Sequence, residues 1–386
     1  MIFGFRSSSA VFLIAIGSLL LMQRSVHADF TFGSGANEFT ITTVTVGNAG
    51  NSADIATTYN NIGSQTPGSV SYSYEVMKYE VTRGMVFKFN NQNDASSGSR
   101  DITLDLNFTP DPQYEDTFNP YRFNTPGDAS SGVRDTLPAS GISGAEAAQF
   151  VNWLNAEKGY AAAYNLDMNN DSSDWTTWSV AEWDSGDTGY LASQPYRNSE
   201  ARFFLMNFDE AYKAAFYDSS TDSYFDYATG SNTLPRVYGQ FYDPAPPTIP
   251  YQGTLSDSVV KLGNAKAIAE ADQAGGVSPY GVMGITGSIG DLLEFTSLAS
   301  LGSFGGSFHN GSTADLYAHN AALYYNVSTN TEFYSSGFRV IYADLSSSSG
   351  GSSSPTVPEP GTAMALGLLG IVGFANHRRR RRVRSL

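Results

Sequence analysis

The order of apolar and polar residues predicts β-structure at both ends of a long central region. Residues 30–46 alternate and are rich in Thr, Val and Phe, a pattern typical of paired strands. Residues 70–81 alternate in a similar way, with Tyr and Val at most of the apolar positions. Short apolar segments rich in Gly, at 281–296, 302–308 and 337–342, predict further strands near the end of this region.

Two capped helices and one shorter helix are predicted between these strands. Ser143 and Glu146 form the S-x-x-E pattern of a capping box, and Asn207 and Glu210 repeat its spacing. Apolar residues follow each cap on one helical face: Ala147, Phe150, Val151 and Leu154 after the first, and Phe208, Ala211, Tyr212 and Ala215 after the second. The shorter helix begins after Thr82, and its apolar residues are Met85, Val86 and Phe89.

Long polar segments separate these elements. Residues 91–136 and 230–279 contain many polar residues, Pro and Gly, and predict extended loops. The chain has 386 residues, of which 41% are hydrophobic and 13% aromatic, so it can build a substantial core. Its 38 glycines and many Tyr and Phe residues favour a loop-rich fold with short strands over a helical bundle.

The first 28 residues have the pattern of a secretory signal peptide. Arg6 lies in a short n-region, residues 11–22 are apolar, and Val26 and Ala28 are small residues at the −3 and −1 positions. Cleavage after Ala28 is therefore predicted. The alternative is an uncleaved anchor helix, for which the apolar run is short.

Four further segments form the C-terminal end. Residues 346–356 are a Ser/Gly-rich linker that ends just before Pro358, Glu359 and Pro360. An apolar, Gly-rich stretch at 361–375 and five consecutive arginines follow. An apolar stretch beside a basic cluster orients in a membrane with the basic end in the cytoplasm. Because this stretch is short for a stable span, we expect it to act as a transient anchor.

This C-terminal order resembles the PEP-CTERM sorting signal. The resemblance rests on Pro358, Glu359 and Pro360, the apolar stretch and the arginine run, and it covers about 30 residues. It implies recognition by an exosortase, removal of the tail, and delivery to the surface or the extracellular matrix of a Gram-negative-type bacterium. The alternative is an ordinary C-terminal membrane anchor. The expected organisation is a signal peptide at 1–28, one domain at 29–345, the linker at 346–356 and the sorting signal at 357–386.

Charge and cysteine content exclude several classes of function. Of the 22 basic residues, eight lie in the two ends, which leaves 14 basic against 37 acidic residues between positions 29 and 360. Such an acidic domain repels nucleic-acid phosphates and attracts cations. The absence of cysteine excludes disulfides, thiolate nucleophiles and thiolate metal sites.

Six segments of the central region, in order, resemble motifs of the formylglycine-generating enzyme (sulfatase-modifying factor) family. They are YEVMKYEVTRGMVFKFNN (74–91), LPASGISGAEAAQFVNWLN (137–155), ARFFLMNFDEAYKAAFYD (201–218), GSIGDLLEFTS (287–297), GGSF (305–308) and GFRV (337–340). The resemblance spans about residues 39–345. It implies an α+β fold, a variant of the C-type-lectin-like fold with much irregular backbone and two or three short helices.

The departures from that family concern its chemistry. Its enzymes hold copper with two cysteines, and the corresponding positions here are Asn310 and Asp315. Neither residue can be a thiolate ligand for Cu(I). We therefore expect no bound copper and no formylglycine-generating activity.

Two carboxylates stand where the family binds calcium. The resemblance places Asp291 and Glu294 at the N-x-x-E positions that supply calcium ligands, and oxygen ligands suit that ion. The alternative is that Glu294 is a buried structural carboxylate paired with an arginine such as Arg339. By the same resemblance, Asn264 is a weaker candidate for a second calcium site.

Histidine and tryptophan supply two further candidates. His309 and His319, with Asp315 between them, could form a two-histidine, one-carboxylate metal site, although such a pair in a Gly/Asn-rich loop is usually polar surface. Aromatic residues cluster in the polar segment 175–190, where they either stack on sugar rings or pack over the core. Trp153 lies on the first capped helix, which favours packing.

The sequence as a whole predicts an exported envelope or matrix protein with a non-catalytic domain of the sulfatase-modifying-factor type. We expect a binding or structural module that an exosortase-type enzyme processes and that binds extracellular polysaccharide. The alternatives are a divergent enzyme that uses a non-cysteine metal site, and a purely structural matrix component.

Overall fold

The computed structural model describes residues 29–55, 66–92, 102, 136, 138–167, 178–238, 258–260, 276–287, 289–295, 301–305, 318, 322–325 and 336–346. The predicted signal peptide, most of the 91–136 segment and the sorting signal lie outside these residues. Within the described ranges, no helix is both long enough and apolar enough to cross a membrane.

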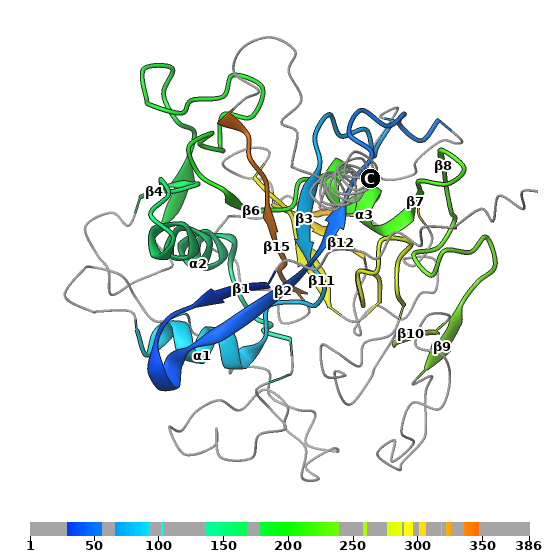
Figure 1. The fold of residues 1–386 in the computed structure, drawn as a ribbon, viewed down its shortest axis with the longest axis horizontal. Coiled ribbons are helices and arrows are strands. Elements are labelled where there is room, and N and C mark those ends of the chain that lie inside the picture. Colours follow the sequence, from blue (N-terminus) through cyan, green and yellow to red (C-terminus); the bar gives the residue numbers. More distant parts are fainter. Residues whose placement is uncertain are drawn as a thin grey trace, which may run out of the picture.

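A five-stranded antiparallel sheet forms the centre of the domain (Figure 1). Its order is β1 (Asp29–Phe32), β2 (Phe39–Val46), β3 (Tyr74–Met77), β15 (Val340–Tyr342) and β6 (Phe203–Leu205). In β15, Ile341 faces Val76 on one side and Phe204 on the other. The last strand therefore lies between strands from the first quarter and the middle of the chain. The predicted strand pair at 30–46 is confirmed as β1 and β2.

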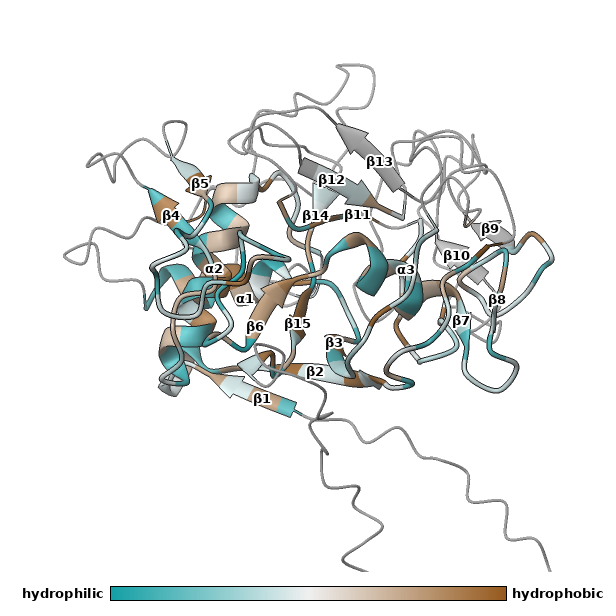
Figure 2. Cartoon of the chain, turned by 90° about the horizontal axis from the view of Figure 1, so that it is seen from above, coloured by the Kyte–Doolittle hydropathy of each residue, from teal (hydrophilic) through white to brown (hydrophobic). Residues whose placement is uncertain are grey.

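A second sheet contains the Gly-rich segments near the end of the domain. Its order is β13 (Ala322–Tyr325), β12 (Leu301–Phe304), β11 (Gly290–Leu292) and β14 (Ser336–Gly337), and only the β11–β14 pair is parallel. In Figure 2 its strands β11 and β14 lie on the side of the molecule opposite β1 and β2.

Three two-stranded sheets complete the described β-structure. They are β4 (Asn165–Asp167) with β5 (Ser179–Ala181), β7 (Tyr217–Asp218) with β8 (Ser223–Tyr224), and β9 (Arg236–Tyr238) with β10 (Ser258–Val260). The β9–β10 pair is parallel and falls inside the segment predicted as loop. That prediction was wrong at this point, because a three-residue strand leaves no periodic pattern to detect.

The three α-helices of the described residues are those predicted from the sequence. They are α1 (Arg83–Asn90), α2 (Gly144–Glu157) and α3 (Phe208–Phe216), and a single 3₁₀ turn, η1 (Gly35–Asn37), precedes β2. Both predicted capping boxes form. In each, the side-chain oxygen of the N-cap residue accepts from the backbone N–H of the glutamate, and the glutamate carboxylate accepts from the backbone N–H of the N-cap residue. Figure 2 shows α1 and α2 on one side of β3, β15 and β6, and α3 on the other.

Aromatic rings join the helices to the sheet. Phe150 of α2 packs edge-on against Phe338, with 5.5 Å between ring centroids, and Trp153 packs edge-on against Phe89 of α1 at 5.3 Å. Phe39 of β2 stacks on Trp153 at 5.9 Å. The predicted apolar face of α2 is fully buried, and each such large side chain contributes about 1.5–3 kcal/mol. Trp153 thus packs against core residues, as its position on the helix predicted.

Two glycines of the GGSF and GFRV segments are required by close backbone approach. A Cβ on Gly305 would lie 2.1 Å from the carbonyl oxygen of Ile285, and φ at Gly305 is +92°. A Cβ on Gly337 would lie 2.5 Å from the carbonyl oxygen of Ala139. Any other residue would force the backbone apart at these points. The domain is thus a mixed α and β structure with short elements and tight connections.

Candidate functional site

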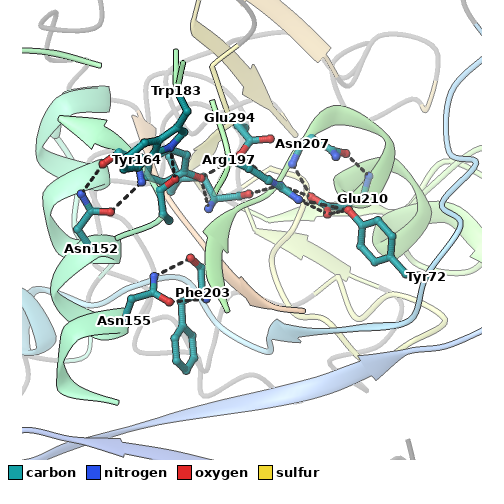
Figure 3. Close-up of polar contacts among 12 residues, drawn as sticks. Tyr72, Asn152, Asn155, Tyr164, Trp183, Arg197, Phe203, Asn207, Glu210 and Glu294 are labelled. Atoms are coloured by element: carbon teal, nitrogen blue, oxygen red, sulfur yellow. Dashed lines mark hydrogen bonds and ion pairs between the residues drawn. The ribbon is translucent and has the colours of Figure 1, made fainter. Parts of the chain in front are cut away.

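A buried arginine, Arg197, binds two carboxylates from distant parts of the chain (Figure 3). Its Nη1 and Nη2 donate to Oε1 and Oε2 of Glu210, each at 2.8 Å, and its Nε donates to Oε1 of Glu294. Arg197 and Glu210 are fully buried, and Glu294 is 6% exposed. One positive charge is therefore shared by two carboxylates, which leaves one negative charge in excess when both are ionised.

Local structure explains how these side chains meet. Glu210 is the third residue of α3 and closes the capping box, because the backbone N–H of Asn207 donates to its Oε2 at 2.7 Å. Arg197 precedes β6, whose residue Leu205 accepts from Nη2 at 2.7 Å. Glu294 follows β11, and its backbone N–H donates to the carbonyl of Met206 at 2.7 Å. The start of a helix, the end of a strand and a loop converge on one guanidinium.

Two tyrosines complete the network. The hydroxyl of Tyr72 donates to Glu210 and accepts from Nη1 of Arg197 at 3.2 Å. The hydroxyl of Tyr164 donates to Oε1 of Glu294 at 3.1 Å and accepts from the backbone N–H of Leu205 at 2.8 Å. Burial raises the pKa of both tyrosines well above the usual value. Both hydroxyls therefore stay protonated and keep their donor role.

A pocket of about 340 Å³ opens over Glu294. Its lining consists of Glu182, Ser193, Gln194, Pro195, Tyr196, Asn207, Phe208, Asp209, Leu293, Glu294 and Phe295. Burial raises the pKa of Glu294 to about 7, in opposition to Arg197. Burial also raises the pKa of Asp209, whose Oδ1 accepts from the backbone N–H of Gly68 at 2.9 Å. The pocket therefore combines carboxylates, amides and aromatic rings above a fixed floor.

The second predicted calcium ligand, Asp291, lies in a separate buried cluster. Its Oδ2 accepts from Nε of Arg339 at 2.9 Å, and Nη2 of Arg339 lies 3.4 Å from Oε1 of Glu80. All three side chains are fully buried. Burial raises the pKa of Glu80 to about 8 and that of Asp291 to about 6, in opposition to Arg339.

Asp291 and Glu294 are thus each paired with an arginine of their own. Glu294 is the buried, arginine-paired carboxylate that the alternative described, but its arginine is Arg197, and Arg339, the example given, pairs with Asp291. Among the described residues, no group of three or more His, Asp and Glu side chains is arranged to hold a metal ion. Calcium at Asp291 and Glu294 stays a prediction.

The aromatic segment 175–190 divides between core and surface. Trp178 is fully buried, so it packs in the interior. Trp183 is half-buried, and its Nε1 donates to the carbonyl of Ala163 at 3.1 Å. Trp175 lies outside the described residues, as do Asn264, His309, Asn310, Asp315 and His319.

Sequence reasoning missed most of this site. Arg197 stands in no motif, and its two carboxylate partners lie 13 and 97 positions away. Glu182 and Asp209 are ordinary acidic residues in an acidic chain, and only the fold brings them to one pocket. Two signals were available: the capping-box spacing located Glu210, and the family resemblance singled out Glu294, but neither identified Arg197 as their shared partner.

Comparisons with known proteins identify the C-terminal end. A family model described as the PEP-CTERM protein-sorting motif matches residues 356–381. No relative is found among curated protein sequences. Solved structures similar to this chain include the Treponema denticola variable protein 1, with 15% identity, a TM-score of 0.41, and coverage of 83% of this chain and 99% of that one. The crystal structure of CarF has 14% identity, a TM-score of 0.42, and coverage of 78% and 98%. Both TM-scores are too low to establish a shared fold.

The matched motif confirms the sorting signal that the sequence predicted. It indicates an exported protein that is sorted by an exosortase and directed to the cell surface.

Proposed function

We propose that the central domain is a non-catalytic binding module, displayed at the cell surface or in the extracellular matrix, whose ligand is extracellular polysaccharide. The observation that carries this proposal is the pocket over Glu294, where carboxylates, amides and three aromatic side chains share one lining. Polar groups at a fixed spacing suit the hydroxyls of a sugar, and aromatic rings suit its apolar face. Export to the cell surface brings such a pocket into contact with matrix glycans.

The proposal includes a scaffold of the sulfatase-modifying-factor type. Two segments that carry the resemblance supply β3 and β6, and the GFRV segment supplies the first residue of β15, which lies between them in the central sheet. The required glycines lie in motif segments as well, Gly305 in GGSF and Gly337 in GFRV. We also propose that residues 361–375 anchor the chain transiently in the inner membrane before exosortase removes the tail.

A calorimetric titration tests the binding function. The producing organism's extracellular polysaccharide is added to the purified full chain, once with calcium and once with EDTA. Saturable heat supports the binding module, and loss of that heat in EDTA assigns calcium to it. The absence of binding heat in both titrations contradicts the proposal and favours a structural matrix component.

The rival interpretation, an enzyme that uses a metal held without cysteine, is tested by the metal content of the purified protein and by an activity assay. We expect no formylglycine on a Cys-x-Pro-x-Arg peptide when copper is supplied, because the chain has no thiolate to hold Cu(I). Mass spectrometry of the peptide checks this, and an aldehyde product would contradict the non-catalytic assignment. A peptide without the cysteine is the control.

A further inference from the structure

We infer that the pocket over Glu294 selects a ligand that carries a primary ammonium group on a sugar ring, that is, an amino sugar with a free amine. This inference rests on the proposed function and specifies its ligand. Three carboxylates line the pocket, from Glu182, Asp209 and Glu294, and none of the described lining residues is basic. A ligand that carries a positive charge would balance these carboxylates, because no described lining residue does so.

The charge balance beneath the pocket gives the physical reason. Arg197 binds Glu210 through two parallel hydrogen bonds, a geometry that pairs one guanidinium with one carboxylate. Glu294 receives only the Nε contact and the Tyr164 hydroxyl, and it is the member of the network that reaches the pocket. When both carboxylates are ionised, Glu294 therefore presents the excess negative charge of the network to a ligand in the pocket.

The lining also explains why a sugar fits better than a simple amine. Tyr196 and Phe295 lie next to each other in the pocket floor, with ring centroids 6.1 Å apart, and both are almost completely buried. The half-buried ring of Phe208, in the same lining, offers an apolar surface to a sugar ring and a favourable face to a cation. Ser193, Gln194 and Asn207 provide neutral hydrogen-bonding groups for hydroxyls. The volume suits a small ligand, of the order of one or two sugar rings.

The decisive experiment compares three sugars that differ only at carbon 2. Glucosamine, N-acetylglucosamine and glucose are each titrated calorimetrically into the purified full chain in EDTA at neutral pH. We expect saturable heat with glucosamine alone, because acetylation removes the charge and glucose has none. Equal heats with all three, or none with glucosamine, would overturn the inference. Nα-acetyl-lysine provides the same ammonium without a sugar, and binding of this probe in place of glucosamine would overturn the sugar assignment.

Two substitutions locate the binding. Asp209→Asn keeps the oxygen that accepts from Gly68, and Glu182→Gln changes an exposed rim residue, so neither is expected to unfold the domain. Each should weaken glucosamine binding about tenfold or more. Glu200→Gln is the control, because it removes the same charge from an exposed position outside the lining, and it should leave glucosamine binding unchanged. If both pocket variants bind as the parent does, the amine binds elsewhere and the inference fails.

This test separates the inference from the proposed function. Heat with the whole polysaccharide but none with glucosamine removes the ammonium requirement and leaves the binding module intact. If neither the polysaccharide nor glucosamine gives binding heat, the proposed function is contradicted as well.

Discussion

At the scale of single residues, the domain is unusual in burying two arginines that each face two carboxylates. Arg197 with Glu210 and Glu294 borders the pocket, and Arg339 with Glu80 and Asp291 lies sealed in the core. Burying ions is costly, and the attraction between them offsets that cost only when every partner is present. Removing one partner therefore has a larger effect than an equivalent change at the surface.

Arg197→Met should lower the free energy of unfolding by about 3–5 kcal/mol, because it leaves two buried carboxylates without their cation. Urea denaturation at neutral pH measures this. Arg202→Met is the matched control, since Arg202 pairs with the half-exposed Asp344 at 3.3 Å, and a surface pair contributes less than about 1 kcal/mol. Equal losses in both variants would contradict the role given to Arg197.

Glu80 makes stability depend on pH. Its folded-state pKa is about 8, above the unfolded value of 4.5, so the folded protein holds this proton more tightly and becomes less stable as pH rises through that range. Asp291 and Glu294 act in the same sense only up to about pH 6 and 7. Buried Lys213, whose pKa burial lowers to about 8, acts in the opposite sense above pH 8.

Between pH 7 and 8 Glu80 contributes most of the slope, because Glu294 loses most of its proton over this range and Lys213 begins to act in the opposite sense. The parent should lose unfolding free energy across it, and Glu80→Gln, which cannot ionise, should show a much flatter profile. Urea denaturation at each pH gives the comparison, with Glu200→Gln as a charge-matched control. A slope that persists in Glu80→Gln would show that another group is responsible.

At the scale of elements, short helices and strands position the site through their ends. The N-cap and first turn of α3 contribute Asn207, Phe208 and Asp209 to the pocket and Glu210 to the arginine beneath it. The segment after β11 supplies Leu293, Glu294 and Phe295. Because each element is only a few residues long, its caps and its packing fix its orientation.

The cap of α2 can be tested directly. Ser143→Ala removes the hydroxyl that accepts from the backbone N–H of Glu146 at 3.2 Å and leaves a buried helix start unsatisfied. The expected loss is about 1–2 kcal/mol of unfolding free energy, measured by urea denaturation. Ser143→Thr keeps the hydroxyl and should lose less. If the two variants lose the same amount, the effect comes from packing and not from the cap.

At the scale of the whole molecule, both ends of the described domain belong to the central sheet. β1 begins at Asp29, directly after the predicted cleavage site, and Phe30 packs on Tyr342 of β15 with ring centroids 4.9 Å apart. The first and last strands of the described domain thus pack against each other. Strands β11 and β14 of the second sheet lie on the side opposite β1 and β2 (Figure 2).

Processing at both ends should leave a mature chain from Asp29 to near Pro358. We expect the second cut close to the start of the sorting motif, which matches residues 356–381. Intact-mass measurement of the protein from its native producer checks both cuts at once. A mass that still includes the arginines at 378–382 would contradict removal of the tail, and one that includes residues 1–28 would contradict signal cleavage.

The sequence by itself determined the features that depend on neighbouring residues. The three helices, their caps, the β1–β2 pair and the sorting motif all follow from local spacing, because a helical face or a capping box spans only a few positions. Tertiary structure alone decided the strand order and the ion pairs. Ile341 lies between Val76 and Phe204, and Arg197 between Glu210 and Glu294, through contacts between distant segments. No local pattern encodes such contacts, since they form only when the whole core closes.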